Sequence, residues 1–119
     1  MNKILIRQYA ARNWRLKKRN ITYQEFLKSK KWLEVKLFIE KNQKYKELYS
    51  KCAVCGNKRE DLHHTSYTKI FRPSFKKRLI DIVPLCRKHH YESHELTENK
   101  EIGLKAAVKK LKKDFAYNA

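Results

Sequence analysis

Apolar residues recur at helical spacing through residues 30–49. Trp32, Val35 and Ile39 follow one another at intervals of three or four positions, which predicts one apolar stripe along a single long helix. Ser29 stands directly before this run and carries a hydroxyl suited to capping the helix N-terminus. The stripe is widened by two further leucines, Leu33 and Leu37. This helix is expected to form part of the core scaffold.

Two more helices are predicted by their start signal or their rhythm. Thr22 and Glu25 form a capping-box pattern, in which a hydroxyl and a carboxylate accept hydrogen bonds from free N–H groups at a helix start. The pattern predicts a helix over residues 23–27. Through residues 103–117 apolar side chains again recur every three or four positions, with lysines between them. This rhythm predicts a final helix that buries four side chains, Leu104, Val108, Leu111 and Phe115.

The first twenty residues mix apolar side chains with arginines and lysines. Their apolar spacing is loosely helical and predicts a short helix followed by a basic linker. Trp14 in this segment either packs on the domain or stacks on a nucleic-acid base, and packing is the favoured role. Because the first acidic residue is Glu25, the segment also has the composition of a transit peptide, but a DNA-contacting arm explains the same composition.

The centre of the chain predicts two short strands. Residues 61–67 have the β-branched and aromatic content of one strand, and residues 81–86 that of a second. Between them, residues 68–80 are interrupted by Pro73 and are expected to form a loop or irregular segment. From about residue 87 the chain is again compatible with a helix. Helices combined with two short strands indicate the α+β class.

Composition points to a polyanionic partner. The chain has 119 residues with two glycines and two prolines, which predicts a single domain without a long flexible linker. Its formal net charge of +18 is spread along the whole sequence and predicts a broad cationic surface, with nucleic acid as the first candidate partner and a merely solvated basic face as the alternative. No apolar run approaches the roughly 20 residues of a membrane span, and no signal peptide is recognisable, so a soluble, intracellular protein without a membrane partner is expected.

All three cysteines and all five histidines lie within residues 52–94. Cys52 and Cys55 form a CxxC pair, and Cys86 and His89 form a CxxH pair about thirty residues later. Two such pairs of thiolate and imidazole ligands predict a structural zinc ion, which would contribute directly to the stability of a small fold. An odd number of cysteines argues against disulfides and favours a reducing compartment.

Four histidines are not needed by that zinc: His63, His64, His90 and His94. His90 and His94 lie one turn apart on one face of the helix expected after residue 87. These four predict a second, histidine-rich site. The alternative is a structural zinc module with spectator histidines.

The order of these motifs resembles the HNH endonucleases, also called ββα-metal nucleases, in their small bacterial and phage form. The segments that carry the resemblance are YQEFLKSKKWLEVK, CAVCG, LHHTSY, DIVPLC and CRKHHYESH. It covers residues 23–95 and implies an α+β domain over residues 1–119 with a zinc-stapled ββα-metal core over residues 52–95. Residues 1–22 would form a basic N-terminal arm or helix, and residues 96–119 a C-terminal basic helix.

The resemblance implies roles for the remaining histidines. His64 would be the general base that takes a proton from water. His63, where many members have Asp, would bind the catalytic divalent ion, Mg²⁺, Mn²⁺ or another, together with His90. His94 resembles the extra helix histidine of the nuclease colicins, which touches the metal or the phosphate; it could equally lie beside the ligands or face solvent. The reaction implied is phosphodiester hydrolysis that leaves a 5′ phosphate and a 3′ hydroxyl.

Two features depart from the family pattern, and the strand raises a geometric difficulty. His89 stands where the family usually has Cys, which zinc accepts. No Asn occurs between His64 and Cys86, although the family Asn fixes the backbone near the base; Ser74 or Arg72 are the candidates to replace it. Neighbours on a regular strand face opposite sides, so His63 and His64 are expected to share a site only where the strand is twisted or ends. A flat strand with one of the two in the core would count against a nuclease.

A metal-dependent DNA endonuclease in the cytoplasm of a bacterial cell or a phage-infected host is therefore expected. A run of basic residues between the strands is expected to clamp the DNA backbone: Arg72, Lys76, Lys77 and Arg78. Two alternatives remain, a non-catalytic zinc-containing DNA-binding module and an RNA-binding or ribosome-associated zinc protein. Whether the chain acts as a monomer or a homodimer is left open.

Overall fold

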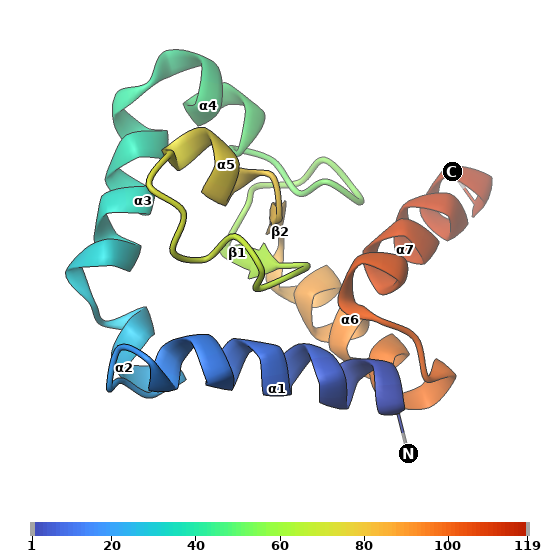
Figure 1. Ribbon diagram of the computed structural model, residues 1–119. Coiled ribbons are helices and arrows are strands. Elements are labelled where there is room, and N and C mark those ends of the chain that lie inside the picture. The colour runs from blue at the N-terminus through green and yellow to red at the C-terminus, as the bar shows by residue number, and fades with distance from the viewer. Residues whose placement is uncertain (1, 119) are drawn as a thin grey trace.

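The computed structural model describes residues 2–118 and combines helices with a small sheet (Figure 1). The predicted α+β class is confirmed. In chain order the elements are α1 (Lys3–Lys17), α2 (Tyr23–Leu27), α3 (Lys30–Lys41), α4 (Gln43–Leu48), β1 (Asp61–His64), α5 (Phe75–Leu79), β2 (Ile82–Leu85), α6 (Arg87–Lys100) and α7 (Leu104–Asn118).

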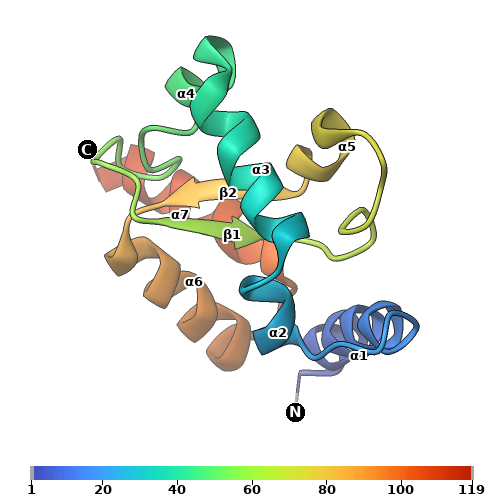
Figure 2. The ribbon, with the colours of Figure 1, turned by 90° about the vertical axis from the view of Figure 1, so that its left-hand side faces the viewer.

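The sheet consists of β1 and β2, which run antiparallel (Figure 2). Asp61 pairs with Leu85 at one end and His64 with Ile82 at the other, and the register between them is uninterrupted. α6 begins directly after β2 and packs against both strands and against α7. The order strand, strand, helix therefore holds the histidine-rich segments in one place.

The N-terminal segment forms a longer helix than its apolar spacing predicted. Asn2 caps α1 by accepting a hydrogen bond from the Leu5 N–H, and its side-chain amide donates to the Ile102 carbonyl at 2.8 Å. Gln8 in turn accepts from the Leu104 N–H at 3.0 Å, at the start of α7. α1 is thus stabilised by contacts with the chain almost one hundred residues away, which local periodicity does not reveal.

The single helix predicted over residues 30–49 is broken at Asn42, so this prediction was wrong. Asn42 is extended, with φ −110° and ψ 108°, and its side chain accepts a hydrogen bond from the Tyr45 N–H. It therefore ends α3 and caps α4. The expected stripe of Trp32, Val35 and Ile39 is buried, whereas two leucines expected to widen it, Leu33 and Leu37, are exposed.

Part of the expected irregular segment, residues 68–80, is helical. Ser74 caps α5 by accepting a hydrogen bond from the Lys77 N–H, and Leu79 at its end is buried. The predicted strands at residues 61–67 and 81–86 are confirmed as shorter elements, as are the helix and capping box after Thr22.

A larger core lies between α1, α2, α3 and α5 and includes Leu16, Phe26 and Ile39. A smaller core surrounds the cysteines and takes in Leu85 and Val108. In α7, Leu104, Ala107 and Val108 are buried, but Leu111 is only half-buried and Phe115 is exposed, so the predicted apolar face ends one to two turns early. Within residues 2–118, no helix has the length and hydropathy needed to cross a bilayer.

Candidate metal centres and the adjoining cavity

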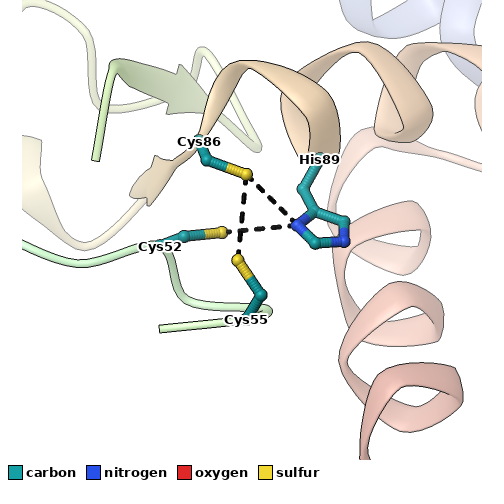
Figure 3. Close-up of side chains that lie close together, drawn as sticks. All are labelled: Cys52, Cys55, Cys86 and His89. Atoms are coloured by element: carbon teal, nitrogen blue, oxygen red, sulfur yellow. Dashed lines mark hydrogen bonds between the residues drawn. The ribbon is translucent and has the colours of Figure 1, made fainter. Parts of the chain in front are cut away.

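The four residues of the predicted zinc site converge at the base of the sheet (Figure 3). The Cys55 and Cys86 sulfurs are 3.8 Å apart, and His89 Nδ1 lies 3.3 Å from Cys86 Sγ and 3.8 Å from Cys52 Sγ. A tetrahedral zinc ion with Zn–S bonds of about 2.3 Å separates two sulfur ligands by about 3.8 Å. The cluster is therefore compatible with the structural zinc site that the spacing predicted.

Local backbone geometry shapes the first half of this cluster. Gly56 has a φ of +78°, which turns the chain directly after Cys55 at no steric cost. The Ala53 N–H donates to the Pro84 carbonyl at 2.8 Å and ties the turn to β2. Cys86 stands at the N-cap of α6, so His89 follows in the first turn of that helix. The CxxC and CxxH pairs thus meet because the second pair follows β2 directly, and β2 is hydrogen-bonded to the turn that carries the first pair.

Hydrogen bonding prepares one of the thiols for a metal. Burial is the largest influence on the pKa of Cys52 and raises it, but backbone N–H donors from Cys86, Cys55 and Val54 outweigh burial and lower the pKa to about 6. The thiolate, which is the form that binds zinc, is then accessible at neutral pH. Burial raises the pKa of Cys86, so this second sulfur depends on a nearby cation to ionise.

A second cluster consists of His63, His90 and His94, whose potential ligand atoms all lie within 4.8 Å of one another. The Nε2 atoms of His90 and His94 are 3.2 Å apart. Zn–N bonds of about 2.0–2.1 Å in a tetrahedral shell place two nitrogens about 3.3 Å apart. The ring of His63 approaches those of His90 and His94 with centroid distances of 4.9 and 5.2 Å. His63 and His90, which were predicted to bind the second ion, therefore lie close together, and His94 lies beside them.

Asp61 orients this cluster, and its role was missed by sequence reasoning. One carboxylate oxygen of Asp61 lies 3.1 Å from His90 Nδ1. This contact favours the tautomer in which Nδ1 carries the proton, so that Nε2 offers its lone pair to a metal. The available signal was its position two residues before His63, since residues i and i+2 of a strand share one face.

The side chain of His63 tests whether the cluster fits a cation. It is 3% exposed, and its Nε2 atom has no hydrogen-bond partner among residues 2–118. Burial, and then the neighbouring His90 and His94, lower the pKa of His63 to about 3, so the ring is neutral. A hydrogen bond between His90 and His94 would satisfy those two rings and leave His63 Nε2 alone. One shared cation would satisfy all three nitrogens, so these residues fit a metal ion.

His64 points toward a different set of neighbours from His63. Its ring lies 5.0 Å from that of Trp32, 5.3 Å from that of Tyr67 and 6.4 Å from that of Phe26. It is 5% exposed, and burial followed by the Arg12 charge lowers its pKa to about 4. The expected distortion is not observed, because strand pairing is regular up to His64, where β1 ends. A regular strand with His64 packed on the core rings of Phe26 and Trp32 is the arrangement that was expected to count against a nuclease.

His63 and His64 nevertheless both line one cavity, which has a volume of about 500 Å³. Its wall includes the consecutive residues 59–64, together with His90 and His94. In the part of the chain that the structure describes, β1 pairs only with β2, so its other edge has no strand partner. Since the cavity follows that edge, side chains from both faces of β1 reach it without a bulge.

Arg12 of α1 also lines the cavity, and nothing in its local sequence singled it out. Its guanidinium lies 4.2 Å from the ring centroid of Tyr23, 4.8 Å from that of Tyr9 and 5.4 Å from that of Tyr67. Its Nε donates to Asn13 Oδ1 at 3.1 Å, and cation–π contacts with three rings hold the charge in place. The cavity therefore has a fixed positive charge beside the neutral His64.

The basic residues of the segment between the strands differ in their exposure to solvent. Arg72, Lys76 and Lys77 are exposed and remain available to phosphates. Arg78 is 6% exposed; its Nε donates to the Arg72 carbonyl, and its guanidinium lies 5.0 Å from the Phe75 ring centroid. The burial of Arg78 argues against the predicted contact with DNA, because its charged group stabilises the turn before α5.

The backbone after His64 is held by Asp81. The Asp81 carbonyl accepts hydrogen bonds from the Thr65 N–H at 2.8 Å and from the Thr65 hydroxyl at 3.1 Å. Ser74 instead caps α5, and the Arg72 carbonyl accepts from Arg78. Ser74 and Arg72 thus have other partners, and the backbone carbonyl of Asp81 holds this segment.

Comparison of the chain with models of known protein families gives no match, and neither the curated proteins nor the solved structures give a significant one. Function is therefore inferred from the two metal-ligand clusters and the cavity alone.

Proposed function

We propose that this protein is a metal-dependent DNA endonuclease of the HNH type. The observation that carries the proposal is the buried Nε2 of His63, which has no hydrogen-bond partner among the described residues and lies near two more imidazoles at the edge of a cavity. The antiparallel pair of β1 and β2, with α6 directly after β2 and a cysteine-rich cluster at its base, supports the same assignment, although α5 lies between the two strands in the chain. A net charge of +18 suits a polyanionic substrate.

In this proposal His63, His90 and His94 hold the catalytic ion, and Asp61 orients His90. When bound, the ion would supply positive charge to the scissile phosphate and to the leaving 3′ oxygen. Three imidazole ligands favour later transition-metal ions such as Zn²⁺ or Ni²⁺ over Mg²⁺ and Mn²⁺, which suit oxygen ligands. The cysteine cluster would hold a separate, structural zinc ion.

His64 is proposed as the general base. Its lowered pKa keeps the ring neutral at neutral pH, so that it can accept a proton from water. The surrounding aromatic rings of Trp32 and Tyr67 would restrict its orientation. Arg12, on the same cavity wall, would receive the phosphate and stabilise the charge that develops on it. Asp81 would replace the family Asn in holding the backbone that follows His64.

Nicking of supercoiled plasmid tests the proposal. The purified protein is incubated with Mg²⁺, Mn²⁺, Co²⁺, Ni²⁺ or Zn²⁺, and His64→Ala and His63→Ala are compared with Tyr91→Ala, a change on the exposed side of α6. We expect nicking by the wild type and by Tyr91→Ala, and a loss of about 100-fold or more in His64→Ala, as for other general bases. The absence of nicking with every ion would retire the enzymatic function.

One observation favours a second candidate, a non-catalytic DNA- or RNA-binding protein. His64 is packed among aromatic rings, an environment typical of a core histidine. This candidate predicts tight, salt-dependent binding without nicking, and it leaves His63 Nε2 unexplained. Competition between DNA and RNA at identical salt concentration identifies its ligand.

A further inference from the structure

A second hollow lies at the C-terminal half of α1. It has a volume of about 420 Å³ and is lined by two aromatic and four basic side chains, with Thr68 between them. None of the described residues that line it is acidic. We call it the Trp14 groove; its six aromatic and basic residues are Trp14, Arg15, Lys18, Arg19, Phe71 and Arg72.

The aromatic rings of the groove are held between cations. Trp14 is 56% exposed, and Lys18 Nζ lies 3.6 Å from its ring centroid. Arg15 is 5.7 Å from the same ring, and Arg19 is 4.2 Å from the ring of Phe71. The favoured role of Trp14 in packing is therefore not observed, since the chain buries Trp32 and leaves Trp14 in solvent. An exposed indole among positive charges offers a stacking surface and phosphate contacts together.

We propose that the Trp14 groove binds single-stranded DNA, with a base stacked on Trp14 and adjacent phosphates held by Lys18, Arg19 and Arg72. Bases within a duplex are already stacked on one another, so an indole can stack only on a base that has left the duplex. The positive charges alone would accept either form of DNA. Trp14 is thus the residue that gives the groove its preference for a single strand.

One part of the inference, the path of a strand between the proposed active site and the groove, rests on the proposed function. Tyr67 lines the cavity and Thr68 lines the groove, and on α1 Arg12 faces the cavity whereas Trp14 faces the groove. Residues two apart on a helix point to different sides of it, so a strand would pass around α1 between the cavity and the groove. Unpaired DNA beside the scissile phosphate is the substrate feature that this arrangement would recognise.

Fluorescence provides the test, because the chain has two tryptophans and only Trp14 is exposed. The full-length protein is titrated with a labelled single-stranded oligonucleotide and with its duplex, at fixed salt and without added divalent ions. We expect quenching of tryptophan emission by the single strand, and a loss of about tenfold or more in its affinity in Trp14→Ala. Trp14→Phe should restore part of that affinity, and duplex affinity should change little in either variant.

A charge-matched pair separates the groove from the general basic surface. Lys18→Gln with Arg19→Gln is compared with Lys109→Gln with Lys112→Gln, which removes the same charge from exposed positions of α7. The first pair should weaken single-strand binding more than the second. Equal losses from both pairs, unchanged affinity in Trp14→Ala, or equal losses of single-strand and duplex binding would each overturn the proposal.

The two proposals fail separately. Single-strand binding that depends on Trp14 in a protein that never nicks plasmid would leave the groove standing and remove the nuclease. Nicking by a protein whose affinity for single-stranded DNA is unchanged in Trp14→Ala would support the nuclease and remove the groove.

Discussion

At the scale of single residues, partners far away in the sequence give the histidines their chemistry. His63 has a buried nitrogen without a partner among residues 2–118, a condition that costs free energy unless a ligand satisfies it. His90 acquires its orientation from Asp61, which lies on another element. The proposed ion site is therefore sensitive to residues that would not themselves bind the ion.

Replacing Asp61 with Asn should weaken the second metal site. The contact with His90 Nδ1 would no longer involve a charge, so its preference for the metal-binding tautomer should fall, and affinity should drop by about 10- to 100-fold. Co²⁺ titration followed by visible absorption measures this affinity. Glu60→Gln, which changes an exposed carboxylate next in sequence that contacts Arg87, is the matched control and should bind as the wild type does. Equal Co²⁺ affinity in Asp61→Asn and wild type would contradict the proposed role of Asp61.

Tyr49 links two elements through one hydrogen bond whose strength depends on pH. Its hydroxyl donates to the Leu79 carbonyl at 2.8 Å, and burial raises its pKa above the ordinary value of 10.0. A raised pKa in the folded state means that the unfolded chain loses its proton first. The stabilisation is therefore complete below pH 10 and is lost as the pH rises through the folded pKa.

Tyr49→Phe should accordingly lower the free energy of unfolding by about 1 kcal/mol at neutral pH, the usual contribution of such a bond. Urea denaturation of wild type and variant across neutral and alkaline pH measures the difference between them. We expect this difference to shrink above pH 10. A difference that stays constant over the same range would show that ionisation of Tyr49 is not linked to folding.

At the scale of elements, capping residues decide where helices begin and how they are joined. Asn42 interrupts what would otherwise be one helix, because its side chain caps α4. Asn2 caps α1 and also donates to the Ile102 carbonyl between α6 and α7. Asn42 thus acts only on the helix that follows it, whereas Asn2 also connects the start of α1 to the segment between α6 and α7.

The two asparagines provide a matched comparison. Asn42→Ala should cost about 1 kcal/mol, the usual value for loss of an N-cap. Asn2→Ala loses a cap and, in addition, leaves buried carbonyls without their donor, so its cost should be larger by about 1–3 kcal/mol. Urea denaturation gives both values. Equal costs would mean that the link from Asn2 to the end of α6 contributes nothing to stability.

At the scale of the whole molecule, the cysteine cluster joins β2, α6 and the turn before β1. The smaller core, with Leu85 and Val108, is assembled around these ligands. A structural zinc ion contributes on the order of 10 kcal/mol in zinc-finger peptides. Cohesion of this half of the molecule is therefore expected to depend on the metal.

Cys86→Ala should lose the structural zinc ion and melt at a much lower temperature than the wild type. His63→Ala, which removes a ligand from the other cluster, should keep that zinc and melt close to the wild-type temperature. Zinc analysis and thermal melting followed by circular dichroism distinguish the two variants. Retention of zinc and of the wild-type melting curve by Cys86→Ala would rule out this site.

The distribution of charge predicts how binding responds to salt. Lys76 and Lys77 are exposed, so Lys76→Gln with Lys77→Gln should weaken DNA binding and reduce the slope of log K against log[salt] by about 0.9 for each phosphate that the protein no longer neutralises. Arg78→Gln should instead lower stability and leave the slope unchanged, because its guanidinium is buried. Fluorescence anisotropy at several salt concentrations measures the slope. A smaller slope in Arg78→Gln would show that its side chain reaches DNA after all.

Contacts between residues close in sequence could be predicted from the sequence alone. The spacing of Cys86 and His89, the capping box of Thr22 and Glu25, and the position of His94 one turn after His90 depend only on the geometry of one helix or turn. The meeting of the two cysteine pairs was also predicted, because zinc accepts only a few ligand arrangements. The α+β class could also be predicted, because the patterns that indicate helices and short strands are local.

The remaining features were decided by the tertiary structure. Burial of Arg78, the place of Arg12 in the cavity and exposure of Trp14 depend on how α1 and α5 pack against segments far away along the chain. The strand carrying His63 and His64 could be predicted, but not that a cavity follows its free edge and receives both side chains. Local spacing determines which neighbours in sequence can touch, whereas burial, unsatisfied nitrogens and shared cavities arise only when distant segments meet.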